Sequence, residues 1–268
     1  MTQVQVDGDR QVYYEVHGEG EALLYVGGWG LFTGERFTNI AADWRAAFRV
    51  VAADYPGLGG TSPLDGPATS DLLAADALAA VDDAGIETFH VVGEGGLGAA
   101  VAQVLAAGHP ERVSSAVMTS GWAWPEPYHD VQLRAMRAMR EKADFDDFRM
   151  LTAFLSYLPE YINEGTGPLV RSYDGEDNVA SRREAHLALI DANITHDARD
   201  VLGAITCPCL VICGGEDLLG GPRLARDLAD RIDGAELVVL EGVPHVFSSV
   251  PGGQQRYLDA VNRFLRIA

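Results

Sequence analysis

The chain has 268 residues, of which 47% are hydrophobic and 22% are charged. This composition is typical of a folded globular protein, and the length suits one sizeable α/β domain with room for an inserted subdomain. The formal net charge of −19 disfavours binding to nucleic acid or to anionic membranes.

The first part of the chain predicts a hairpin followed by buried strands. Residues 4–16 (VQVDGDRQVYYEV) flank the turn signal Asp7-Gly8-Asp9. Later segments are short and almost continuously apolar, as expected for strands that are buried on both faces of a parallel sheet. These segments are residues 22–28, 49–55, 89–93, 114–120, 208–214 and 236–242.

Helical patterns lie between these strands. Ser70 is a candidate N-cap for a helix that continues through Val81. Pro222 suits a first helical position, and residues 257–265 place apolar side chains along one stripe. The alternation of strands and helices predicts an α/β fold, with a mostly parallel sheet of about eight strands and helices on both faces.

The alternation stops between about Trp122 and Thr195, where the sequence becomes helical and aromatic. We expect residues 122–195 to form a helical cap over an active site, on a core made of residues 1–121 and 196–268. An ordinary helical packing layer is the alternative. The side chains expected to line the substrate pocket are Trp122, Trp124, Tyr128, Phe154 and Tyr157, together with Phe247 from the core.

The junctions between strands and loops carry the candidate site, because open α/β sheets bind ligands outside the carboxyl ends of their strands. The order of these junctions resembles that of the α/β-hydrolase superfamily, in particular its capped esterases, lactonases and epoxide hydrolases. The matching segments are residues 6–30, 54–63 (DYPGLGGTSP), 84–96 (AGIETFHVVGEGG), 108–113 (GHPERV), 207–217 (CPCLVICGGED) and 240–252 (LEGVPHVFSSVPG).

The resemblance implies that Asp217 is the acid and His245 the base of a catalytic triad. Each residue follows a predicted strand, so both side chains are expected at adjacent strand ends. In such a pair the buried carboxylate fixes the tautomer of the imidazole and stabilises the imidazolium as it forms. The alternative for His245 is a polar loop residue without a partner.

The sequence departs from the family at the nucleophile elbow. The family has G-x-S-x-G there, whereas this chain has GEGGLG at residues 93–98. Counting from the strand side places the nucleophile at Gly95, and counting back from His109 places it at Gly96, which implies an extra residue. Glu94 precedes this position, where it either faces the pocket as a second carboxylate or points sideways.

The oxyanion turn departs as well, because the usual His-Gly is replaced by Gly27-Gly28, although the backbone N–H of Trp29 can still donate to an oxyanion. Without a nucleophile, covalent acyl transfer by the family's mechanism is excluded. The sequence favours a natural enzyme in which His245, oriented by Asp217, acts as a general base on water or on the substrate.

Several alternatives stay open. Base catalysis fits hydrolysis, but also elimination, cyclisation or cofactor-free oxygenation. An inactive ligand-binding protein is disfavoured by the retained Asp217 and His245, and an engineered serine-to-glycine variant is disfavoured by the altered neighbours of the elbow. Gly93, Gly95 and Gly98 also match the dinucleotide fingerprint G-x-G-x-x-G, but the strand that follows does not end in a ribose-binding acid.

The cysteines Cys207, Cys209 and Cys213 are expected on one face of a strand, as buried small side chains rather than metal ligands. No signal pattern opens the chain, and no apolar run approaches ~18 residues. We therefore expect a cytoplasmic enzyme of secondary or aromatic metabolism, a monomer or homodimer, with a small hydrophobic or aromatic substrate. We expect no metal, cofactor, nucleic-acid partner or membrane partner.

Overall fold

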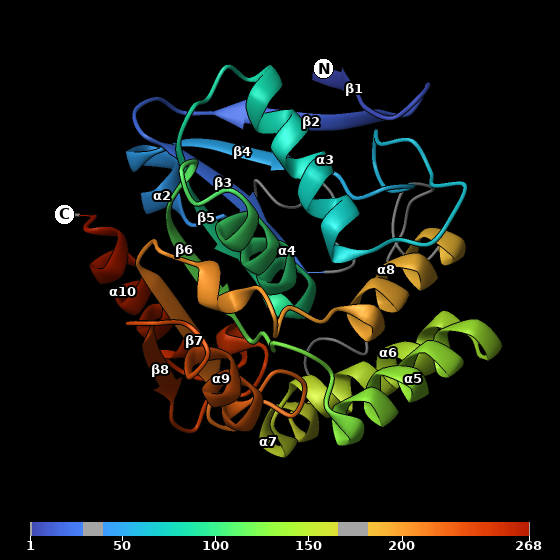
Figure 1. The fold of residues 1–268 in the computed structure, drawn as a ribbon. Coiled ribbons are helices and arrows are strands. Elements are labelled where there is room, and N and C mark those ends of the chain that lie inside the picture. The colour runs from blue at the N-terminus through green and yellow to red at the C-terminus, as the bar shows by residue number, and fades with distance from the viewer. Residues whose placement is uncertain (1, 29–39, 166–181, 268) are drawn as a thin grey trace.

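The computed structural model describes residues 2–28, 40–165 and 182–267, in which eight strands form one sheet of order β1-β2-β4-β3-β5-β6-β7-β8 (Figure 1). β1 and β2 pair antiparallel, β2 also pairs antiparallel with β4, and every later pairing is parallel. This arrangement confirms the predicted fold class. The strands are β1 (Thr2–Gln5), β2 (Gln11–His17), β3 (Ala22–Val26), β4 (Arg49–Ala53), β5 (Phe89–Gly93), β6 (Val113–Thr119), β7 (Cys209–Gly214) and β8 (Glu236–Leu240).

Helices cover both faces of the sheet and bury two apolar clusters (Figure 1). One cluster lies under α3, α4 and α9 and includes Leu97 and Leu228. The other lies under α2 and α10 and includes Trp44 and Tyr257. The helices of these two layers are α2 (Ala42–Ala47), α3 (Ser70–Asp83), α4 (Gly95–Gly108), α9 (Pro222–Ala229) and α10 (Gly253–Leu265), and two short 3-10 helices are η1 (Leu202–Ala204) and η2 (Phe247–Ser249).

The starts of α3 and α9 agree with the sequence prediction to within one residue. Pro222 begins α9, as expected, because a proline needs no N–H partner there. The cap of α3 is Thr69 rather than Ser70, since the Thr69 side chain accepts a hydrogen bond from the N–H of Leu72. The Ser70 hydroxyl instead contacts His196 Nδ1 at 2.9 Å inside the protein.

Between β6 and β7, the described residues form the α-helices α5 to α8, which gather on one side of the molecule (Figure 1). In the part of this span that the structure describes there is no strand, as predicted. The two connections to the core are joined by a hydrogen bond from the N–H of Ala198 to the carbonyl of Ala123, at 2.9 Å. The helices are α5 (Pro127–Lys142), α6 (Phe145–Ser156), α7 (Pro159–Asn163) and α8 (Arg183–Thr195).

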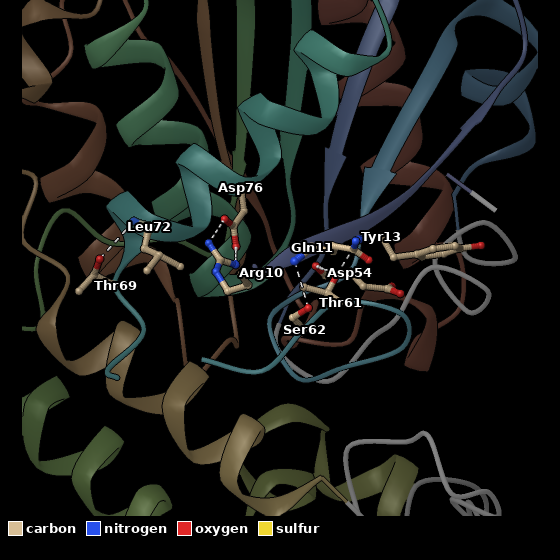
Figure 2. A network of polar contacts seen from close by, with 9 residues as sticks. All are labelled: Arg10, Gln11, Tyr13, Asp54, Thr61, Ser62, Thr69, Leu72 and Asp76. Carbon is tan, nitrogen blue, oxygen red and sulfur yellow. Dashed lines mark hydrogen bonds and ion pairs between the residues drawn. The ribbon is translucent and has the colours of Figure 1, made fainter. Parts of the chain in front are cut away.

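The loop that follows β4 is held against β2 by side chains of the DYPGLGGTS segment (Figure 2). The hydroxyl of Thr61 accepts from the N–H of Tyr13 at 2.9 Å and donates to the carbonyl of Asp54 at 3.0 Å. The N–H of Gly60 donates to the Asp54 carboxylate at 3.0 Å. These bonds satisfy polar groups at the end of the strand, so the loop returns to the sheet in a fixed path.

An ion pair ties the N-terminal hairpin to α3 (Figure 2). The two terminal guanidinium nitrogens of Arg10 donate to the carboxylate of Asp76, at 2.7 Å and 2.5 Å. Both side chains are largely buried, so this two-pronged contact fixes the angle at which the hairpin meets the helix.

Two glycines let the start of α4 approach the sheet closely. A Cβ atom at Gly98 would overlap the carbonyl oxygen of Val26 on β3, and one at Gly93 would overlap the carbonyl oxygen of Gly98. The glycines of this segment are therefore required by backbone packing. This packing sets where the N-terminus of α4 stands relative to the end of β3.

We predict that Gly98→Ala lowers the free energy of unfolding by about 2 kcal/mol or more, since the added methyl group meets backbone that cannot move aside. The matched control is Gly108→Ala at the other end of α4, where an added Cβ atom meets nothing within 4 Å. The control is expected to be neutral or stabilising by up to ~1 kcal/mol. Urea unfolding of both variants measures the difference, and equal effects would contradict this packing account.

Candidate active site

Asp217 and His245 lie side by side beyond the ends of β7 and β8. The Nδ1 atom of His245 donates to Asp217 Oδ2 at 2.9 Å. The other carboxylate oxygen accepts from the backbone N–H groups of Leu219 and Gly220, at 2.7 Å and 2.9 Å. Because Nδ1 carries the proton, Nε2 of His245 is left as the basic atom.

The surroundings keep the carboxylate ionised and the imidazole basic. Burial acts to raise the pKa of Asp217, but the charge and hydrogen bond of His245 outweigh it, so this pKa lies below its ordinary value of 3.8. Burial acts to lower the pKa of His245, but Asp217 outweighs it, so this pKa lies above 6.5. The Asp217 side chain is fully enclosed, while that of His245 is 22% exposed, so the base can reach a ligand.

The turn between β5 and α4 is tight. Glu94 alone links the end of β5 to the start of α4, and Gly95 has φ +67°. Positive φ is the left-handed region that glycine enters without strain. Gly95, rather than Gly96, is thus the residue at the apex, and the extra residue counted back from His109 does not lie in this turn.

Gly95 and Gly96 differ in the space around them. A Cβ atom at Gly95 would have only the Cα of Gly28 within 3.4 Å, at 3.3 Å. A Cβ atom at Gly96 would overlap the ring of Trp122. Among the described residues, an added Cβ atom at Gly95 therefore meets one close backbone neighbour, whereas the position above Gly96 is filled by the indole.

A cavity of about 150 Å³ opens at this point and brings together the elbow, His245 and side chains of α5 and α8. Gly28, Gly95 and His245 come from the core. None of the described residues that line it carries a hydroxyl, a thiol or a carboxylate. The complete lining among the described residues is Gly28, Gly95, Gly96, Trp122, His129, Leu133, Met136, Asn193, Leu219 and His245.

The predicted oxyanion turn is described only in part. Gly28 lines the cavity, and Trp29 lies outside the described residues. The carbonyl of Gly27, just before Gly28, accepts a hydrogen bond from the Tyr55 hydroxyl at 2.6 Å. The loop after β4 thereby fixes the backbone that leads into this turn.

Glu94 does not face the cavity. Its carboxyl group is buried on the opposite side of the turn, where the hydroxyls of Tyr25 and Tyr257 donate to it, the latter at 2.6 Å. Burial raises the pKa of Glu94 and outweighs the hydrogen bonds from Tyr25 and Tyr257, which act to lower it. Of the two possibilities for Glu94, the structure favours the sideways orientation, in which it links the elbow to β3 and α10.

Of the six aromatic residues expected in the pocket, the structure brings only Trp122 to this cavity. Tyr128 and Phe154 are 74% and 67% exposed on the outer side of their helices, so their assignment to the pocket is corrected. The other three also lie elsewhere: Trp124 under the guanidinium of Arg199, Tyr157 against Tyr161, and Phe247 against Tyr257 in the core.

Helical periodicity, rather than the positions of aromatic residues, identifies the side chains that face the cavity. The buried positions of α5 are His129, Leu133, Met136 and Arg140, which form one face of the helix. Three of them line the cavity, and spacings of three and four residues would have found them. The same reasoning applied to α8 would have shown Asn193 on a face that is otherwise mostly apolar.

His129 contributes a neutral side chain to the lining of the cavity. Burial lowers its pKa to about 4, and its ring packs edge-on against Trp122 with centroids 4.3 Å apart. Gln132 donates its amide N–H to the carbonyl of Leu218 at 2.9 Å and therefore turns its oxygen toward His129 Nδ1, 3.2 Å away. These contacts fix the ring of His129 without giving it a charge.

The cysteines lie away from the cavity. Cys209 and Cys213 on β7 belong to the same buried apolar cluster, so they share one face of the strand as predicted. Within residues 2–28, 40–165 and 182–267, no three histidine, cysteine or acidic side chains are grouped so that they could hold a metal ion. Over the same residues, no helix has the length and apolar character that crossing a membrane requires.

Comparison with known proteins agrees with this geometry. The sequence profile of the alpha/beta hydrolase family matches residues 16–254. The RutD protein of Azorhizobium caulinodans, named for carbamate hydrolysis, is 30% identical over 254 residues, which cover 91% of each chain. The pimeloyl-acyl-carrier-protein methyl ester esterase of Neisseria meningitidis is 29% identical over 230 residues, covering 83% of this chain and 85% of that protein.

Solved structures show the same fold. A hydrolase from Pseudomonas aeruginosa superposes with a TM-score of 0.83 at 23% identity, covering 98% of this chain and 97% of that one. The enol-lactonase of Burkholderia xenovorans superposes with a TM-score of 0.78 at 24% identity, covering 99% and 100%. The chain belongs to the alpha/beta hydrolase family, and its enzyme class is that of the hydrolases.

We predict that Asp217→Asn lowers the pKa of His245 from above 6.5 to below 6.5. The variant removes the negative charge that raises this pKa, while burial, which lowers it, remains. Titration of the imidazole signals by NMR measures the shift. Asp200→Asn, which removes a charge from an exposed residue, is the control and should leave the titration unchanged; an unchanged titration in Asp217→Asn would contradict the assigned pairing.

Proposed function

We propose that this protein hydrolyses a small, uncharged ester, lactone or carbamate by general-base catalysis from His245, without a covalent intermediate. The observation that carries the proposal is the pairing of an intact Asp217–His245 dyad with an elbow apex, Gly95, that bears no side chain. In the family the apex carries the nucleophile. Here His245 is retained as the base, whereas the apex residue, Gly95, has no side chain that could act as a nucleophile.

The position of the missing side chain at Gly95 suits a water molecule. A serine at the apex would place a methylene and a hydroxyl above the turn, and the gap left by a glycine is close to the size of one water. The cavity lining supplies Nε2 of His245 as the acceptor for a proton of that water. The hydroxide formed as the proton leaves attacks the carbonyl carbon of the substrate, and the His245 imidazolium then protonates the leaving group.

The N-terminus of α4 supports the same reaction. The first N–H groups of a helix have no partner within the helix and carry a partial positive charge. In the family, the backbone N–H after the nucleophile stabilises the oxyanion, and the corresponding group here is that of Gly96. Because α4 begins at Gly95 and both glycines line the cavity, this donor faces the place where negative charge develops.

The size and lining of the cavity favour a small, mainly apolar substrate. A volume of about 150 Å³ is comparable with an apolar cavity of roughly 150 Å³ that accommodates benzene in another protein. Trp122, Leu133, Met136 and Leu219 are the large apolar side chains of the described lining. The relatives named for carbamate and methyl ester hydrolysis share a carbonyl bonded to a leaving nitrogen or oxygen, which is the bond we propose for this chain.

The proposal predicts that His245→Ala reduces kcat on aryl and alkyl esters by 100-fold or more, within the range of about 10² to 10⁴ that general-base catalysis contributes. The wild-type rate should fall as the pH decreases through a value above 6.5, because protonation removes the base. Steady-state assays across pH 5–9 measure both effects. Turnover that survives loss of His245 would exclude this mechanism, and ligand binding without turnover would favour an inactive binding protein.

Restoring a nucleophile gives a second test. Gly95→Ser should produce a burst of product and an acyl-enzyme, because the dyad can then activate the hydroxyl. The added Cβ atom lies 3.3 Å from the Cα of Gly28, so it requires a shift of a few tenths of an ångström there, and the left-handed φ of Gly95 adds strain. Gly95→Ala is the matched control, with the same backbone cost and no hydroxyl. Gly96→Ser should give no burst, since Trp122 occupies the required space; a burst from it instead would show that the apex has been wrongly assigned.

A further inference from the structure

Asn193 is a buried polar residue in the lining of the cavity. It lies on α8, is only 3% exposed, and lines the cavity beside apolar side chains. Its buried neighbours along the helix are Leu189, Ile190 and Ile194. A polar amide at such a position is unfavourable unless its hydrogen bonds are made.

The protein satisfies only one of the hydrogen bonds that this amide can make. The Nδ2 atom of Asn193 donates to the carbonyl of Leu189 at 2.9 Å. That bond fixes the amide orientation, because a carbonyl can accept only from the N–H side. One N–H and both lone pairs of Oδ1 are left without a partner among the described residues.

The free part of the amide is open to the cavity. Among the described residues of the cavity lining, the fully enclosed side-chain atoms without a hydrogen bond are Trp122 Nε1 and His129 Nε2. The Asn193 oxygen has no partner among the described residues and is not one of these enclosed atoms, so it retains accessible surface, and its residue lines the cavity. The enclosed nitrogens of Trp122 and His129 are shielded, so Asn193 and His245 are the polar side chains of the described lining that a ligand can reach.

The charge of the cavity limits what Asn193 can bind. No lysine, arginine or carboxylate is among the described residues of the lining, and Asp217, which lies behind His245, is paired with that histidine. A ligand with its own negative charge would be desolvated there without a countercharge. An uncharged group that both donates and accepts, such as a hydroxyl, matches the free N–H and oxygen of the amide.

We propose that Asn193 is the specificity-determining residue of the cavity and selects substrates that carry a hydroxyl group close to the carbonyl. The inference rests on the proposed function only for the statement that the bound molecule is a substrate. Binding of the hydroxyl itself does not depend on turnover. A substrate with a methyl group in place of the hydroxyl would leave the amide unpaired and buried, which is the basis of strong discrimination in polar sites.

The test uses ligands that cannot be hydrolysed. Acetoin and methyl isopropyl ketone differ only by a hydroxyl in place of a methyl group, and diacetone alcohol and methyl neopentyl ketone form a second such pair with the hydroxyl one carbon further away. Dissociation constants are measured by ligand-observed NMR. In wild-type protein we expect at least one hydroxylated member to bind about tenfold more tightly than its methyl partner.

Asn193→Leu should reverse this preference, because the wall becomes apolar and the methyl members then gain from burial. Met136→Leu changes the wall without changing its hydrogen bonding and should keep the wild-type preference. The side-chain amide resonances of Asn193 in the wild-type protein should shift on addition of acetoin or diacetone alcohol, and this readout holds even if the leucine variant folds poorly.

A wild-type chain that binds the methyl members more tightly, or that does not bind the hydroxylated ones, overturns the role of Asn193. An unchanged preference in Asn193→Leu does the same. Since ketones are not hydrolysed, these outcomes are independent of the hydrolysis assays. Loss of the general-base mechanism with retained hydroxyl selection would therefore overturn the proposed function alone.

Discussion

The pairing of Asp217 with His245 is the interaction on which the site depends, and the sheet imposes it. Two backbone hydrogen bonds, from Gly215 to Leu240 and from Glu216 to Val243, each at 2.9 Å, continue the contact between β7 and β8 past the strand ends. The loops that carry Asp217 and His245 are therefore held together by backbone hydrogen bonds, independently of the two side chains. A carboxylate buried in this way stays charged, and the imidazole gains basicity from it.

The conformation of the elbow, residues 93–98, depends instead on close backbone packing. Its outer glycines allow α4 to pack closely on the sheet, and Gly95 provides a left-handed turn at the helix start. The G-x-G-x-x-G pattern of this segment therefore has a packing explanation that involves no nucleotide. Glu94 adds a buried link to Tyr25 and Tyr257 behind the turn, so the N–H groups at the start of α4 and the dyad are positioned by separate parts of the core.

The fold could be predicted from the sequence, because short apolar strands, turn signals and the order of the motifs are patterns that can be recognised in a single chain. The proximity of Asp217 and His245 could be predicted for the same reason, since each lies in the loop after one of two strands expected to be adjacent. The cavity wall could not be predicted from residue type. Tyr128 and His129 are adjacent in sequence, yet helical geometry turns the first toward solvent and the second toward the cavity, and only the periodicity of α5 distinguishes them.

The central claim is that water, and not a side chain, attacks the substrate. Rapid quenching of the native protein during turnover of an activated ester, followed by intact-mass spectrometry, tests it most directly. The account predicts that the protein mass stays unchanged at every time point and that product forms without a burst. An acyl adduct that appears and decays at the rate of turnover, mapped to any side chain of the protein, would contradict the account.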